Sequence, residues 1–292
     1  MATTTAPAPG AALRRWTRRR SARRHPQAWM LGVAAWGIAL LFVAPVLWMA
    51  LTSLHSESDA ATNPPSLAAK LTLSGYREFF GSNPWPALIN SATAAVVSTL
   101  LALALATPAA YALSIKPVRK WTDVMFFFLS TKFLPVVAAL LPVYLIAKDL
   151  HLLDNIVALV VIYASMNLPI AVWMMRSFLA ELPREMLEAA EIDGARLPTL
   201  LRRIILPLTA PGVAATALIC FIFAWNELLF ARVLTSTVAG TSPVFLTGFI
   251  TSEGLFLAKL CAAAIVVSLP VLIAGFAAQD KLVQGLSMGA VK

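Results

Sequence analysis

Polar side chains inside otherwise apolar segments are the residues of this chain best suited to chemistry. Polar groups at membrane depth are costly, so they often serve a function. One interpretation is a hydrophilic path, in which donors and acceptors meet the hydroxyl groups of a passing solute. A tryptophan could stack on an apolar face of such a solute. The residues concerned are Lys132, Asn167, Trp225, Asn226 and Glu227.

The same residues can instead hold the protein together. Asn167 and Asn226 can bond neighbouring helices or backbone groups freed by proline. Lys132 can extend toward the membrane surface or pair with Glu227. The sequence leaves both interpretations open.

Other kinds of site find no support in the sequence. Cys220 and Cys261 both lie in apolar runs, and the three histidines are far apart, so neither a metal site nor a disulfide is predicted. No Gly-x-x-x-x-Gly-Lys-Ser/Thr loop occurs, so nucleotide binding would need another subunit. No nucleophile–base pair or paired carboxylates occur in the apolar segments, and we therefore predict no catalytic residues.

Composition indicates a membrane protein. Of 292 residues, 59% are hydrophobic and 13% charged, and the mean hydropathy is +0.79. Globular domains are nearer a quarter charged. A net charge of +9 would favour nucleic-acid binding in a soluble protein. Here the arginines gather between apolar segments, which is typical of cytoplasmic loops, and no nucleic-acid partner is predicted.

Six apolar segments are long enough to cross a bilayer as helices, which predicts an all-α integral membrane fold. Residues 29–278 would form this domain, between a largely disordered Arg-rich tail at 1–28 and a tail at 279–292. Lys and Arg cluster on one side, so both termini are predicted to be cytoplasmic. Prolines within the segments predict kinks. The predicted spans are 29–52, 86–115, 124–147, 155–178, 208–233 and 256–278.

Residues 181–207 form the one long charged, helix-prone stretch between two apolar segments. Pro183 suits a first helical turn, and Gly194 suits a C-terminal cap that lets the chain reverse. Met186, Ala189 and Ala190 can share one small apolar face. A second helix would re-enter the membrane at Pro207. The pattern predicts a rigid two-helix knob with a charged rim.

This stretch resembles the EAA loop of bacterial ABC importer permeases. The matching residues, at the family spacing, are Glu188, Ala189, Ala190, Gly194, Ile204, Leu206 and Pro207. The resemblance implies a cytoplasmic helix–turn–helix that docks on a dimer of ABC ATPases. ATP and magnesium would then bind to the ATPase, and no cofactor would bind to this chain directly.

Over residues 29–292 the chain is most similar to the maltose-type carbohydrate permeases, in particular their shorter six-helix subunit. The supporting stretches are Met166 to Pro169, Ala224 to Glu227 and Gln284 to Lys292, and Ser130-Thr131-Lys132 is similar to permeases for sugar alcohols. The resemblance implies a bacterial inner-membrane subunit for a sugar or polyol. Its partners would be a second homologous permease, the ATPase dimer and an extracytoplasmic solute-binding protein.

The alternative is a secondary carrier or channel that acts alone. A carrier would be expected to show inverted repeats or buried acidic residues, and Glu227 is the one acidic residue expected inside a span. An intramembrane enzyme is the third and least supported interpretation.

Overall fold

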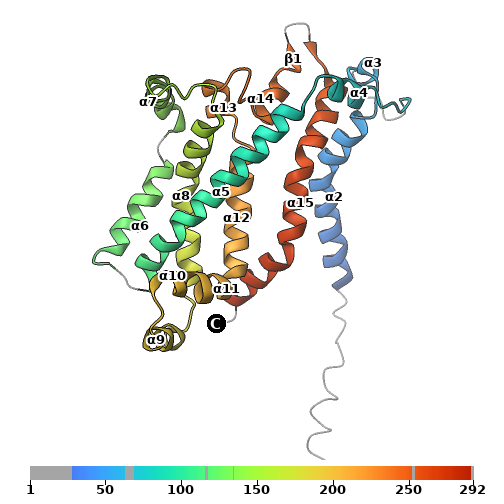
Figure 1. The fold of residues 1–292 in the computed structure, drawn as a ribbon. Coiled ribbons are helices and arrows are strands. Elements are labelled where there is room, and N and C mark those ends of the chain that lie inside the picture. Colours follow the sequence, from blue (N-terminus) through green and yellow to red (C-terminus); the bar gives the residue numbers. More distant parts are fainter. Residues whose placement is uncertain (1–27, 63–68, 116–117, 134, 252–253, 291–292) are drawn as a thin grey trace, which may run out of the picture. The chain divides into compact units, whose positions relative to one another are not determined.

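The computed structural model describes residues 28–62, 69–115, 118–133, 135–251 and 254–290 (Figure 1). The predicted tail at residues 1–28 lies outside the described residues except for its last residue, and so do residues 291 and 292. The chain divides into two units between Met49 and Ala50. The first unit contains most of α2 (Ala28–Thr52), a helix of 25 residues that carries no charge.

The second unit is a helical bundle. Its first half consists of two short helices, the long α5 and α8, and a broken segment between them. In order these are α3 (Glu57–Ala60), α4 (Ser74–Gly81), α5 (Trp85–Ser114), α6 (Trp121–Ser130), the 3-10 turn η1 (Thr131–Phe133), α7 (Val136–Asp149) and α8 (Ile156–Leu179).

Its second half begins with several short helices and ends with a long one. In order these are α9 (Arg184–Ile192), α10 (Leu197–Thr199), the π-helix η2 (Leu200–Ile205), α11 (Leu206–Leu208), α12 (Ala210–Trp225), α13 (Leu229–Leu234) and α14 (Ser242–Thr247). An antiparallel hairpin of β1 (Ile250–Thr251) and β2 (Gly254–Leu255) then precedes α15 (Leu257–Ala290).

The predicted all-α membrane class is confirmed. Among the described residues four helical stretches are long and apolar enough to cross a membrane, namely Trp29–Thr52, Trp85–Ser114, Ile156–Ala180 and Leu257–Lys281. The number rises to six if each of two bent helix pairs is one span. One of these pairs is α6 and α7, where the prediction had a single helix over 124–147. Pro135, which has no backbone N–H to donate, stands at the N-cap of α7.

The core forms where α5, α8 and α12 pack together, with α15 against α12 (Figure 1). Close approach requires small residues at the crossings. A Cβ at Gly212 of α12 would come within 2.2 Å of the Phe178 ring of α8. Alanines at Ala94, Ala102 and Ala106 along α5 are fully buried. In lipid the hydrophobic effect does not drive helices together, so their association depends on close van der Waals packing. Small side chains allow this close approach.

Asp154 ties two connecting segments together at the α7–α8 end of the bundle. Its carboxylate accepts four consecutive backbone N–H groups, from Ser236 to Ala239, at 2.9–3.2 Å. Its own N–H donates to the Leu234 carbonyl at 2.8 Å. Partial burial of the Asp154 carboxyl raises its pKa, but the backbone donors outweigh this and lower the pKa to about 2. This Asp154 clasp fixes the segment between α13 and α14 against the start of α8.

Replacing Asp154 by Asn should loosen the clasp, since the amide carries no charge and one acceptor oxygen fewer. We expect the amides of residues 236–239 to exchange with deuterium about tenfold faster or more at pH 7, because bonds to a charged acceptor contribute about 1.5–3 kcal/mol. Exchange measured by mass spectrometry checks this, with Asp149→Asn as the control at the exposed end of α7.

The stabilisation that the Asp154 clasp contributes depends on pH. Because the pKa of Asp154 is lower in the folded protein than its ordinary value, this stabilisation is complete above about pH 4 and is lost as the pH falls toward 2. The wild-type clasp should therefore stay closed at pH 5. Equal exchange in wild type and Asp154→Asn would contradict this account.

Candidate functional site

The knob predicted over residues 181–207 is present. α9 begins after Pro183, which stands at its N-cap, and Glu185 lies in its first turn, where a negative charge is favourable. Gly194 follows α9 with a φ of +77°, a left-handed conformation that glycine adopts without strain. Its N–H donates to the Glu191 carbonyl, and the next N–H donates to Ala190. The chain therefore reverses where the sequence predicted.

The residues predicted to share one apolar face of α9 do not all lie on the same side of the helix. Leu187 and Ala190 are buried, whereas Glu188 and Ala189 are exposed and Ile192 is 85% exposed. Met186, Ala189 and Ala190 therefore do not form one shared face. Ala190 lies one helical position beyond Ala189, about 100° around the axis, and packs into the protein instead. The outward face presents the charge of Glu188 beside small and apolar side chains.

The second half of the knob leads into the membrane. Leu200 and Ile205 of η2 are buried, Ile204 and Leu206 are partly buried, and Pro207 is exposed. The helical stretch Leu197–Leu208 meets α12 at a bend of 85°. Leu187, Ala190, Leu200 and Ile205 share one core cluster with Tyr111 of α5, Met125 of α6 and Met175 of α8. The knob thus shares one hydrophobic cluster with side chains of α5, α6 and α8.

Arg176 also joins these elements, and the sequence analysis did not identify it. Its guanidinium lies 3.8 Å above the Trp121 ring of α6, and its Nε donates to the Leu113 carbonyl of α5 at 3.2 Å. Both contacts are favourable for a positive charge, since the face of an aromatic ring and the carbonyl groups at a helix C-terminus attract cations. The sequence did offer one sign of its role, because Arg176 lies about one helical turn before the charged stretch at 181–207.

The second candidate site is a polar pocket where two breaks in the helices meet. Lys132 lies in η1, between α6 and α7, and Glu227 lies between α12 and α13. Together with residues of α8 and α12 they line a cavity of about 260 Å³. Its remaining walls are Tyr163, Met166, Asn167, Phe223 and Ala224. In secondary transporters, discontinuous helices of this kind commonly form the binding site.

Each charged or amide group in the pocket has a backbone partner. The Lys132 ammonium donates to the Met166 carbonyl, three residues before Pro169. Glu227 accepts the Phe230 and Ala231 N–H groups at 2.9 and 3.2 Å, and so caps α13. Asn167 donates to the Cys220 carbonyl of α12 at 3.3 Å. Glu227 therefore stabilises the helix break after α12, whereas Lys132 and Asn167 link neighbouring elements, and all three line the cavity.

Lys132 and Met166 also border a neighbouring cavity of about 360 Å³. Side chains of α7 and α8 form most of its lining, with Phe230 of α13. The two cavities adjoin at the Lys132–Met166 hydrogen bond. Lys132 thus stands between the two spaces.

Trp225 and Asn226 lie away from this pocket. Trp225 is buried, and its indole N–H donates to the Val267 carbonyl of α15 at 3.1 Å. Asn226 is exposed and donates to the Ile222 carbonyl of its own helix. Both border a different cavity beside α14 and α15. Of the five predicted path residues, the structure brings together Lys132, Asn167 and Glu227.

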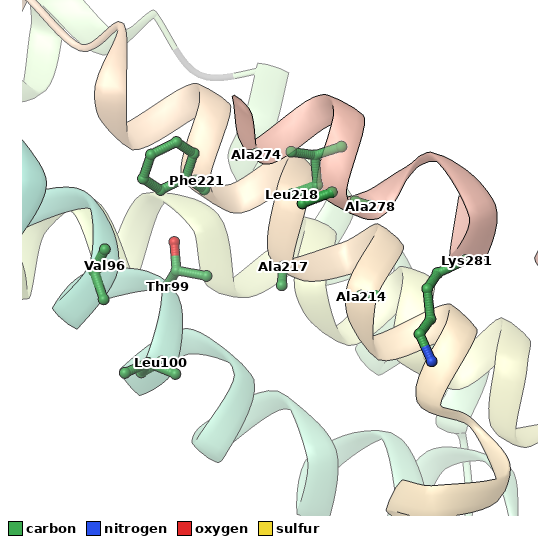
Figure 2. A pocket seen from close by; sticks show the side chains of 11 residues that line it. Val96, Thr99, Leu100, Ala214, Ala217, Leu218, Phe221, Ala274, Ala278 and Lys281 are labelled. Atoms are coloured by element: carbon green, nitrogen blue, oxygen red, sulfur yellow. The ribbon is translucent and has the colours of Figure 1, made fainter. Parts of the chain in front are cut away.

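A further cavity of about 370 Å³ lies between α5, α12 and α15 and is almost wholly apolar (Figure 2). Alanines of α12 and α15 line it, and Lys281 stands at one end. The Thr99 hydroxyl in its wall is buried and has no hydrogen-bond partner. This cavity offers a polyhydroxyl solute few partners. No group of three His, Cys, Asp or Glu side chains within the described ranges is placed to hold a metal.

Comparison with known proteins assigns the chain to a family. Residues 98–287 match the family described as binding-protein-dependent transport system inner membrane component. The probable ABC transporter permease protein y4oR of Sinorhizobium fredii is 39% identical over 256 residues, which is 87% of this chain and 92% of that protein. The trehalose transport system permease protein SugB of Mycobacterium tuberculosis is 34% identical over 277 residues, 93% of this chain and 99% of that protein.

A solved structure shares the fold. It is a bacterial ABC transporter involved in the import of the acidic polysaccharide alginate, and one of its chains matches with a TM-score of 0.71 at 22% identity. The match covers 95% of this chain and 100% of that chain. With its helical membrane fold, its knob and this family match, the chain belongs to the inner-membrane permease components of binding-protein-dependent transport systems.

Proposed function

We propose that this chain imports a sugar or sugar alcohol across the bacterial cytoplasmic membrane as one of two permease subunits. ABC ATPases would supply the energy, and an extracytoplasmic binding protein would deliver the solute. Relatives named for trehalose, diacetylchitobiose and trehalose/maltose transport support a sugar as cargo. Both termini and the knob would face the cytoplasm, where Lys and Arg are enriched.

The observation that carries the proposal is the two-sided α9. Leu187 and Ala190 anchor the helix in the protein, while Glu188 and Ala189 face outward. An exposed face with a charge, small residues and the exposed Ile192 suits a cleft on another protein. The ATPase would bind ATP and magnesium, since this sequence has no phosphate-binding loop of its own.

The packing of the knob offers a mechanism. Closure of the ATPase dimer on ATP would displace α9, and the shared core cluster would pass the displacement to α5, α6 and α8. Packed cores transmit such shifts because they have low compressibility. The binding protein would touch the opposite loops, around residues 53–85 and 236–255. Movement of the helices would open the path alternately to the two sides.

Reversing the charge at Glu188 tests the coupling. Glu188→Lys should lower ATP-dependent uptake by about thirtyfold or more, because a charge placed wrongly at a protein contact costs about 2–5 kcal/mol. Uptake into cells and solute-stimulated ATP hydrolysis are the measurements, at matched amounts of protein. Solute binding by the extracytoplasmic protein should not change.

Glu181→Lys is the matched control, since Glu181 is exposed and precedes α9. It should leave uptake near the wild-type rate. Wild-type uptake in Glu188→Lys would remove the coupling role of α9. Uptake that needs no ATP at all would favour a carrier that acts alone.

A further inference from the structure

The apolar cavity between α5, α12 and α15 is a groove in the surface of the bundle (Figure 2). α12 lies between the other two helices and packs against both. Leu100 in the α5 wall is 62% exposed, so the groove opens outward. Short side chains on α12 and α15 leave the space of about 370 Å³ unfilled, and they belong to Ala214, Ala217, Ala274, Ala277 and Ala278.

The groove runs from the middle of the bundle toward the knob. Val96 and Leu100 line it near the middle of α5, which has 30 residues. Figure 2 shows Lys281 and Ala214 at its other end. α12 follows the knob in the chain and Ala214 lies near the start of α12, so this is the knob end. Lys281 is also the last residue of the apolar span Leu257–Lys281.

The length of the groove matches one leaflet of a membrane. Along α15 its lining extends from Ala274 to Lys281, which is about 10 Å at 1.5 Å per residue. The hydrocarbon of one leaflet is about 15 Å thick, half of the bilayer core. A transmembrane helix of a partner subunit crosses both leaflets and would need a longer groove. The acyl chain of a lipid in the leaflet nearest the knob needs only this part.

Lys281 gives the groove a single charge, and it lies where the apolar span ends. Its side chain is exposed, and the ammonium has no hydrogen-bond or ion-pair partner among the described residues. Asp280, the preceding residue of α15, is exposed and does not line the groove. Lysines near the ends of membrane helices extend toward the headgroup region. The end of the groove therefore offers a free cation at the depth of lipid phosphates.

We propose that this groove binds an anionic phospholipid of the cytoplasmic leaflet. Its acyl chain lies against the alanines of α12 and α15, and its phosphate meets the Lys281 ammonium. A basic residue beside an apolar groove between membrane helices suits such lipids. The chain supplies the van der Waals contacts that the short side chains leave unmade. The inference goes beyond import and takes from the proposed function only the cytoplasmic orientation of the knob.

Photo-reactive lipids test the site. The assembly, purified with its co-purifying subunits, is placed in nanodiscs of phosphatidylcholine. Either phosphatidylglycerol or phosphatidylcholine is added with a diazirine on its acyl chain, and labelled peptides are identified by mass spectrometry. The groove segments of α12 and α15 should be labelled about fivefold more by phosphatidylglycerol, the gain expected from one lysine near an anionic headgroup.

Matched variants separate the headgroup contact from general attraction to a basic protein. Lys281→Gln should label equally with both lipids. Lys120→Gln removes the same charge from an exposed position at the start of α6, outside the groove, and should keep the wild-type preference. Equal labelling of wild type by the two lipids, or the same preference in Lys281→Gln and Lys120→Gln, would overturn the proposal.

A second pair of variants tests the groove itself. Ala277→Phe fills the space from an exposed position, so both lipids should label the groove segments several-fold less. Ile273→Phe, exposed on α15 outside the groove, should label as wild type. Undiminished labelling in Ala277→Phe would place the acyl chain elsewhere. If neither lipid labels these segments in wild type, protein covers the groove and the proposal is wrong.

This proposal and the import function fail separately, because labelling is measured without ATP or solute. Loss of the lipid preference leaves ATP-dependent uptake and its dependence on Glu188 as they are. Uptake that needs neither ATP nor Glu188 would remove the import function, and the labelling of the groove would still stand.

Discussion

Backbone groups that a helix break leaves free must find partners inside the protein, because the hydrocarbon of a bilayer offers none. Charged side chains supply some of these partners. Glu227 caps α13 after the break that ends α12, and Asp154 receives four N–H groups from residues 236–239, which link α13 to α14. Glu57 accepts the first N–H groups of α15 in the same way. The charged side chains thus make breaks possible where a continuous helix would be the default.

Breaks of this kind create both parts of the proposed machine. At α6–α7 and α12–α13 they expose polar groups to a cavity in the bundle. At the knob, the left-handed Gly194 and the bend before α12 place a short helix outside the spans. One core cluster, which contains Leu187, Ile205 and Met175, joins that short helix to the long ones. In the proposed mechanism this cluster connects movement of α9 to rearrangement of the spans.

Much of this architecture could be predicted from the sequence. Hydropathy located α2, α5 and α8 and the start of α15 within a few residues, since about twenty apolar residues in a row have one stable form in lipid. α15 continues to Ala290, beyond the predicted end at residue 278. Gly194 and Pro183 located the turn and the start of α9, because their backbone preferences are local. The EAA resemblance supplied the positions of the residues proposed to couple to the ATPase.

Features that depend on contacts between distant segments could not be predicted from the sequence. One local feature also escaped apolar periodicity, namely the start of α13, where Glu227 accepts the N–H groups of residues three and four positions ahead. Ala189 and Ala190 look alike in the sequence, yet neighbouring helices bury Ala190 alone. Trp225 was expected at the path, but its indole N–H bonds Val267, 42 residues away.

The most direct test of the central claim is to cross-link α9 to whatever it docks on. Cys220→Ala and Cys261→Ala first remove the native thiols, and then Ala189→Cys and Ala190→Cys are compared in the assembly purified from its host. The account predicts that an ATPase subunit cross-links to the chain through Ala189→Cys, whose position is exposed, and not through Ala190→Cys, whose position is buried. If the chain purifies without an ATPase, or both variants cross-link alike, α9 is not the coupling element described here.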